Sequence, residues 1–150
     1  MKTVLMSVLL LVAAAEKKPD FTGTWEFDAK QSTNVAMMST MQLTETIEQS
    51  ATTFVEHGRT VFNGQEQKRD VTYDLGAKPT PNQSPMGDPS TTVTTWDGSS
   101  LVTTWTSSGA VAGTTVTRVE TRTLSADGKI MTVESRRGSN PPVTMVFARK

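Results

Sequence analysis

Apolar residues recur at every second position in the stretch that covers residues 20–32. One face of this stretch carries Phe21, Gly23, Trp25 and Phe27, and the other carries Thr22, Thr24, Glu26 and Asp28. Successive side chains of a β-strand point to opposite sides, whereas a helix would place apolar residues three or four positions apart. The stretch therefore predicts a strand with one buried face and one exposed face.

The same period of two returns along the chain. Residues 69–75 and 143–147 alternate cleanly, and residues 41–47 alternate with an interruption at Glu45. Threonine is abundant in residues 91–105, where β-branching favours a pleated strand over a helix. These patterns predict an all-β chain.

Turn residues separate the predicted strands at short intervals. Glycine-containing turns are predicted at residues 56–59, 62–65, 96–99 and 125–129, and three of the four contain Asn-Gly or Asp-Gly. About eight to ten short strands joined by hairpins form an antiparallel meander, and closure into a barrel removes its exposed edges. The predicted fold is a single antiparallel up-and-down (meander) β-barrel, in preference to a sandwich.

Two segments depart from the strand pattern. Residues 30–39 are polar and then rich in methionine, which predicts a short helix or a loop over one end of the barrel. Residues 76–89 contain four prolines and are predicted to be irregular, as either a mobile lid or a passive loop. The sequence does not assign a role to the second segment.

The first fifteen residues have the pattern of a secretory signal peptide. Lys2 precedes an apolar run over residues 4–12, and three alanines at residues 13–15 provide a small-residue cleavage site. We expect residues 1–15 to be cleaved and residues 16–150 to form one barrel domain that is secreted or periplasmic. The apolar run is too short for a bilayer span, so no membrane span is expected.

Charge and composition narrow the classes of function. Fifteen acidic and fifteen basic side chains cancel, which gives no basic field for nucleic acid. The chain has no cysteine, and its one histidine, His57, lies beside a predicted turn at Gly58. We therefore expect no metal and no cofactor, and we expect His57 at the surface. The sequence contains no catalytic motif, so we expect that the protein is not an enzyme.

The residues around Trp25 resemble those of a known group of barrels. Gly23-Thr24-Trp25, preceded by Phe21, resembles the G-x-W opening of the calycin group, which includes lipocalins and fatty-acid-binding proteins. Residues 91–105, 121–135 and 141–150 are similar in order and spacing to the last four strands of fatty-acid-binding proteins. The chain also resembles the small secreted lipocalin-like proteins of bacteria. This resemblance implies a barrel that binds a small, mainly hydrophobic molecule.

The same resemblance implies roles for particular residues. Trp25 would close one end of the barrel where the first strand meets the last, with Gly23 small to allow a close approach. Arg122 would occupy one of the two arginine positions that bind a fatty-acid carboxylate, whereas the other arginine and a tyrosine are replaced by Met145 and Phe147. The predicted ligand-binding wall residues are Tyr73, Trp96, Trp105, Arg122, Met145 and Phe147.

The alternating charges Arg118, Glu120 and Arg122 allow two interpretations. Inside the barrel they would anchor a polar group, and outside they would form a solvated cross-strand ladder. We expect them outside, because three charges in one small cavity are hard to satisfy.

Two rival functions stay open. A filled barrel would act as a protein-interaction or envelope-associated module, and a cavity below about 300 Å³ would favour it. An enzyme would require His57 or a carboxylate such as Glu45 inside a pocket.

Overall fold

The computed structural model describes residues 17–85 and 87–150, and these residues form one ten-stranded antiparallel sheet. The predicted signal peptide, residues 1–15, lies outside the described residues. The strands are β1 Gly23–Phe27, β2 Gln42–Gln49, β3 Thr53–Phe62, β4 Gln65–Asp74, β5 Thr80–Gln83, β6 Pro89–Asp97, β7 Ser100–Ser108, β8 Thr115–Leu124, β9 Ile130–Arg137 and β10 Val143–Arg149.

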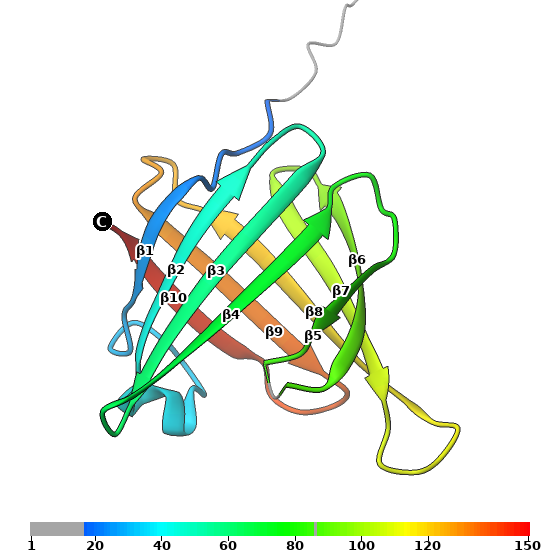
Figure 1. Ribbon diagram of the computed structural model, residues 1–150. Helices are drawn as coiled ribbons and strands as arrows, with labels where there is room; N and C mark the ends of the chain where they lie inside the picture. The colour runs from blue at the N-terminus through cyan, green and yellow to red at the C-terminus, as the bar shows by residue number, and fades with distance from the viewer. Residues whose placement is uncertain (1–16, 86) are drawn as a thin grey trace, which may run out of the picture.

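The sheet curls into an almost closed up-and-down barrel (Figure 1). Its strand order is β4-β3-β2-β1-β10-β9-β8-β7-β6-β5, so nearly every strand pairs with its neighbour in sequence. The exception is the pairing of β1 with β10, which sets Trp25 opposite Arg149 and Phe27 opposite Phe147. The predicted all-β meander barrel is confirmed.

The seam of the barrel lies between β4 and β5, where a side chain replaces the backbone ladder. Asn82 on β5 donates from Nδ2 to the carbonyl of Thr72 on β4 at 2.8 Å. Its Oδ1 accepts the amide N–H of Thr72 at 3.2 Å. One side-chain amide thus makes the two hydrogen bonds that a neighbouring backbone would make.

The barrel has two different ends, which we name by their place in Figure 1. The upper end carries residues 17–22, the β2–β3 turn, and the β6–β7 and β8–β9 hairpins. The lower end carries the β3–β4 hairpin, the β5–β6, β7–β8 and β9–β10 loops, and the 3-10 turn η1 (Ala36–Thr40). This short helix confirms one of the two alternatives predicted for residues 30–39.

The predicted turns are confirmed in three places out of four. Asn63 and Gly64 have φ angles of 49° and 76° between β3 and β4, and Gly98 and Gly128 also have positive φ in hairpins. The turn predicted at residues 56–59 is wrong, because this stretch lies inside β3. There Gly58 pairs with Glu45 on one side and with Arg69 on the other, so two ladders hold it extended.

The prediction of an irregular segment over residues 76–89 is also wrong in part. Residues 80–83 form β5, which pairs with β6 and places Pro81 opposite Thr91. An edge strand tolerates proline because one of its sides needs no ladder hydrogen bonds.

Trp25 is fully buried at the upper half of the barrel. Its Nε1 donates to the carbonyl of Phe21 at 2.8 Å, and the guanidinium of Arg149 lies 4.2 Å from its ring centroid. Arg149 also donates to the carbonyl of Thr22 and passes over Gly23. A Cβ at Gly23 would lie 2.7 Å from Arg149 Nη1, and the φ of 139° there also favours glycine. The close approach at Gly23 is therefore made by Arg149.

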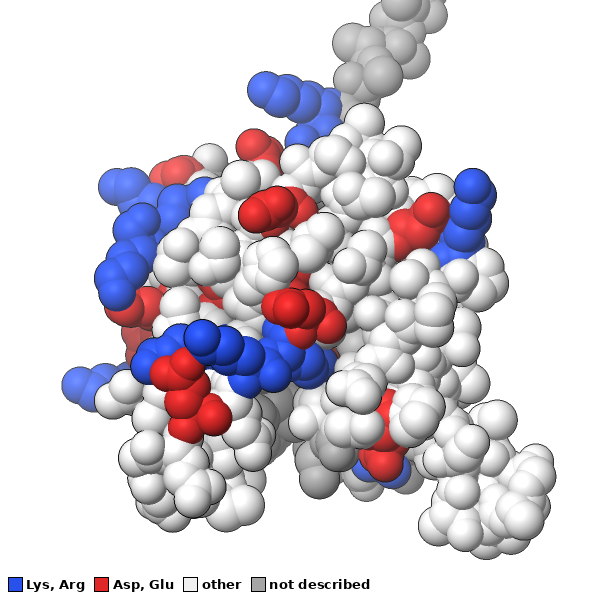
Figure 2. Space-filling view, in the orientation of Figure 1, with Lys and Arg blue, Asp and Glu red and all other residues white. Residues whose placement is uncertain are grey.

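The outer surface mixes charges of both signs. Figure 2 shows red and blue side chains interspersed on one face, with wide uncharged areas between them. The described residues include no helix with the length and hydrophobicity that crossing a bilayer demands.

Candidate functional site inside the barrel

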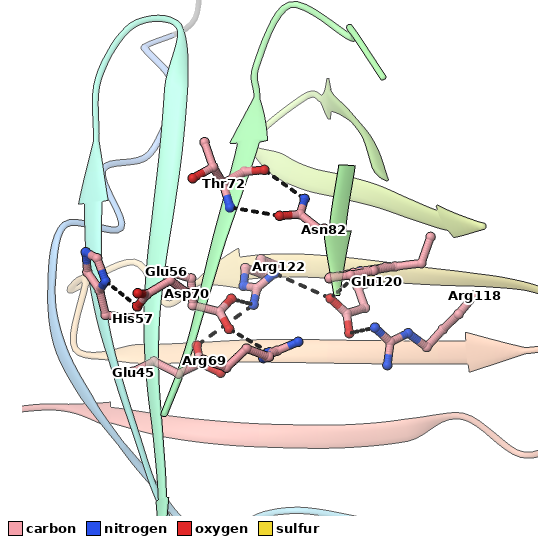
Figure 3. Close-up of polar contacts among 11 residues, drawn as sticks. Glu45, Glu56, His57, Arg69, Asp70, Thr72, Asn82, Arg118, Glu120 and Arg122 are labelled. Atoms are coloured by element: carbon pink, nitrogen blue, oxygen red, sulfur yellow. Dashed lines mark hydrogen bonds and ion pairs between the residues drawn. The ribbon is translucent and has the colours of Figure 1, made fainter. Parts of the chain in front are cut away.

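Six charged side chains meet inside the barrel, directly below its apolar upper half. They are Glu45 on β2, Glu56 on β3, Arg69 on β4, and Arg118, Glu120 and Arg122 on β8 (Figure 3). We call this set the interior charge cluster. Glu45, Glu56 and Arg69 share the inward parity of the buried apolar residues two positions away, Ile47, Phe54 and Val71, and Arg118, Glu120 and Arg122 share one face of β8.

Glu56 joins two strands through its carboxylate. Arg122 Nη2 donates to Oε2 of Glu56, and Arg69 Nη2 donates to Oε1 at 3.0 Å. The side chains of Glu56 and Arg122 are 1% and 4% exposed. A buried guanidinium needs such a partner, because an unpaired buried charge is very costly.

Glu120 forms the second centre of the cluster. Trp105 Nε1 donates to Glu120 Oε2 at 3.1 Å, and Arg118 Nη2 lies 3.2 Å from Oε1. The guanidinium of Arg118 also lies 4.9 Å from the centroid of the Trp105 ring. The expectation that Arg118, Glu120 and Arg122 face outward is therefore wrong. They are tolerated inside because β2, β3 and β4 supply further charges of both signs.

Glu45 differs from the other two carboxylates of the cluster. Its nearest cation is Arg122 Nη2, which lies 3.9 Å from Oε2. Burial, followed by the negative charge of Glu56, raises the pKa of Glu45 to about 8. Glu45 is consequently protonated at neutral pH, which leaves three arginines facing two paired carboxylates. The cluster carries an excess of positive charge.

Two further groups respond to the same surroundings. Burial raises the pKa of Tyr73 well above its ordinary value, and the nearby Glu56 carboxylate adds to this effect. Burial alone lowers the pKa of Arg122, but Glu56 and the other acidic groups around it together outweigh burial and leave that pKa well above its ordinary value. Both groups keep their protons throughout the physiological range.

Polar atoms without a hydrogen-bond partner mark this part of the interior. In the described part of the chain, five such buried side-chain atoms are Glu45 Oε2, Arg69 Nη1, Tyr73 OH, Arg118 Nη2 and Arg122 Nε. All five belong to the cluster or to Tyr73, which touches it. Buried polar atoms are usually satisfied by protein, by ordered water or by a bound molecule.

The space beside the cluster is small. A pocket of about 110 Å³ opens at the lower end and is lined by Trp105, Arg118, Arg137, Ser107, Val116 and part of the β5–β6 loop. A second, shallower pocket of about 380 Å³ lies on the adjoining surface against residues 115–117 and 137–140. Trp105 is the one predicted wall residue that lines either of these two pockets.

The structure brings together three of the six predicted wall residues. The rings of Tyr73 and Trp105 meet edge to face with centroids 5.9 Å apart, and Arg122 lies 5.7 Å from the centroid of Tyr73. The other three lie elsewhere in the core: Phe147 beside Phe27, Trp96 stacked on Phe21, and Met145 half-buried. Ligand contact by these six residues stays a prediction.

His57 lies on the outside of the barrel, in the middle of β3. Its side chain is 45% exposed, and Nδ1 lies 2.7 Å from Asp70 Oδ1. This hydrogen bond raises the pKa of His57 above its ordinary value. Within residues 17–85 and 87–150, no three His, Cys, Asp or Glu side chains are placed to hold a metal ion.

Sequence reasoning missed Glu56 and Arg69 as interior residues. Glu56 was assigned to a turn, although it has the same parity as Phe54. Arg69 precedes Val71 and Tyr73 on one alternating face, which is a signal for an inward position.

No family model and no curated protein sequence matches this chain. Solved structures do match. One described as "REP1-NXSQ fatty acid transporter" aligns with a TM-score of 0.69 at 13% identity, over 87% of this chain and 96% of that chain. This chain has the fatty-acid-binding-protein fold. A Schistosoma mansoni fatty-acid-binding protein in complex with arachidonic acid aligns with a TM-score of 0.65 at 19% identity, over 87% of this chain and 96% of that chain. The structure described as "Human cRBP IV" aligns with a TM-score of 0.62 at 15% identity, over 88% of this chain and 99% of that chain. At these identities the likeness concerns the fold.

Proposed function

We propose that this protein binds a small molecule with a mainly apolar body and one polar group. The observation that carries the proposal is the set of five buried polar atoms without a hydrogen-bond partner, gathered at the centre of the barrel. Leaving such an atom unsatisfied costs about 1–3 kcal/mol, so a polar group of a ligand gains affinity there. Two structures of the same fold are described as a fatty acid transporter and as a complex with arachidonic acid, which supports a ligand of related polarity.

Arg122 is not the proposed anchor, although its position resembles that of a carboxylate-binding arginine. The carboxylate of Glu56 already binds its guanidinium, and the Arg122 side chain is 4% exposed. The accessible members of the cluster are Arg69 and Arg118, with side chains that are 29% and 21% exposed. Of these two, Arg118 also lines the lower pocket, so the polar group of the ligand would meet Arg118 there.

The apolar part of the ligand would lie against Trp105, Val116 and Pro85 in the lower pocket. That pocket measures about 110 Å³, whereas drug-sized ligands occupy about 300 Å³ or more. The proposed ligand is therefore either small or only partly enclosed. A long-chain fatty acid buried along its whole length does not fit this arrangement.

The small pocket also favours a second function. A barrel whose interior is filled by side chains can serve as a protein-interaction or envelope-associated module through its loops. The pocket of about 110 Å³ lies below the volume that separates the two alternatives. This module would not need any small molecule.

The proposed setting is secreted or periplasmic. It depends on the signal-like pattern of residues 1–15. N-terminal sequencing of protein recovered from its own host tests it, because cleavage near Ala15 is the expected result.

Titration with an uncharged apolar fluorophore, Nile red, tests the binding function. We expect saturable, single-site binding in the micromolar range or weaker, accompanied by a change in Trp105 fluorescence that is absent in Trp105→Phe. Trp96→Phe is the matched control, since Trp96 lies at the opposite end of the barrel. Absence of saturable binding, together with a native mass spectrum free of cargo, would favour the filled module.

A further inference from the structure

Two arginines face each other across neighbouring strands at the lower end of the barrel. Arg118 on β8 is in register with Arg137 on β9. Arg137 shares its parity with the buried residues Met131 and Val133, so it lies on the inner face of the sheet. Both arginines line the pocket of about 110 Å³.

Like charges directly opposite each other on a sheet are unfavourable unless something neutralises them. Arg118 and Arg122 both form ion pairs with the one carboxylate of Glu120. For Arg137, the described part of the chain places no carboxylate within ion-pair distance. Asp88 also lines the pocket, yet it forms no ion pair with either arginine among the residues described.

The pocket between the two arginines has the features of a built site. Trp105 lies against the guanidinium of Arg118, with 4.9 Å between that group and the ring centroid. Arg118 Nη2 is buried and lies 3.2 Å from Glu120 Oε1, but it makes no hydrogen bond within the described residues. Ser107 adds a hydroxyl to the lining. The protonated Glu45 leaves the neighbouring cluster with excess positive charge, which further favours an anion.

We propose that the pocket bounded by Arg118, Arg137 and Trp105 binds one oxyanion group, a carboxylate or a phosphate, carried by the ligand. The inference rests on the proposed function and names the charge of the polar group. Arginine suits this role because its guanidinium can donate two parallel hydrogen bonds to a carboxylate or a phosphate. The opening toward the adjoining pocket, which also contains Arg137 and Val116, leaves an exit for the rest of the molecule.

Calorimetric titration with four probes tests this assignment: octanoate, octyl phosphate, 1-octanol and inorganic phosphate. The first three share one apolar chain and differ in the group at its end. We expect at least one of the two anionic amphiphiles to bind about tenfold more tightly than 1-octanol, because a hydrogen bond to a charged group is stronger than one between neutral groups. The ratio between octanoate and octyl phosphate identifies the preferred oxyanion.

Arg137→Gln is the decisive variant, and Arg136→Gln is its matched control. Arg136 is the neighbouring residue on the outer face, where its Nε donates to Glu134 at 2.6 Å. Arg137→Gln should weaken the binding of the preferred anion by about tenfold and change the affinity for 1-octanol by less than about twofold. Arg136→Gln should leave all four affinities unchanged. Both arginines are exposed, so both variants are expected to fold, which near-UV circular dichroism checks.

The outcomes separate the two proposals. Equal affinity for the anions and 1-octanol, or equal losses in the two variants, would overturn the oxyanion site while leaving the binding function in place. Binding of inorganic phosphate that Arg137→Gln removes, without binding of 1-octanol or Nile red, would support the oxyanion site and contradict the apolar function. If no probe binds, both proposals fail.

Discussion

The upper and lower halves of this barrel differ in the polarity of their inward-facing side chains. In the upper half, the inward positions hold fully buried apolar side chains such as Trp25, Phe54 and Met131. One inward position further down β2, β3 and β8, these positions hold Glu45, Glu56 and Arg122. The upper half closes the barrel, and the lower half contains the arginines and the pocket.

The difference between the halves shows what an alternating pattern determines. Parity determines which side chains point inward, whereas their polarity determines whether the interior becomes core or site. Charged residues are stable in the interior because Glu56 on β3 pairs with arginines of β4 and β8, and Glu120 pairs with Arg118. The polar interior is therefore a property of four strands together.

Trp25→Ala should have the largest effect and should disrupt the upper half. Removing a fully buried indole leaves a cavity and exposes the face of Arg149, so we expect a loss of about 4 kcal/mol in the free energy of unfolding. Urea denaturation monitored by circular dichroism measures this loss. A loss below about 1 kcal/mol would show that the upper half does not depend on this residue.

Glu56→Gln should break the lower half by leaving Arg69 and Arg122 without their shared carboxylate. Breaking a buried ion pair costs about 3 kcal/mol or more, because the remaining charge is buried and unpaired. The double variant Glu56→Leu with Arg122→Met removes both buried charges and should recover much of the stability. If Glu56→Gln alone is as stable as the natural protein, the ion pairs do not hold the lower half together.

Glu45→Gln should change how stability depends on pH. The pKa of Glu45 rises from 4.5 to about 8 on folding, so between these values the folded protein binds more protons than the unfolded chain. Its contribution is present in full below about pH 4.5 and is lost as the pH rises toward 8. Glu45→Gln should abolish this decline in stability between about pH 4.5 and 8.

The matched control for this experiment is Glu48→Gln on the same strand. Glu48 points outward with a side chain that is 74% exposed, and it acts only weakly on His57, 4.0 Å away, so its replacement should leave the decline due to Glu45 in place. Urea midpoints between pH 4 and pH 9 provide the comparison. Identical slopes for all three proteins would exclude a buried, protonated Glu45.

Asn82→Ala should have the smallest effect and should act on the seam alone. It removes the two hydrogen bonds to Thr72 and a third to Thr92 Oγ1, at about 0.5–1 kcal/mol each, and leaves the buried aromatic and charged side chains intact. Hydrogen exchange of the Thr72 amide should accelerate more than that of Val71, whose side chain lies in the core. An unchanged exchange rate at Thr72 would mean that the seam is held by other contacts.

The strand pattern around Trp25, the Asn-Gly and Asp-Gly hairpins and the meander were all predictable, because each depends on neighbours close in sequence. The inward position of Arg118, Glu120 and Arg122 was not, because it depends on countercharges from strands far away along the chain. Glu56 illustrates the limit well. Its neighbour Gly58 has the composition of a turn, and only pairing with β2 and β4 together makes the stretch a strand.

The pairing of β1 with β10 has a consequence for the order of events in folding. Most other ladders join strands that are adjacent in sequence and can form early as hairpins, whereas Trp25 and Arg149 meet across almost the whole domain. Closing that long loop has a large entropic cost, and the short β1–β10 ladder must compensate for it. The rate at which the cylinder closes is thus governed by a contact that contributes little to the site it encloses.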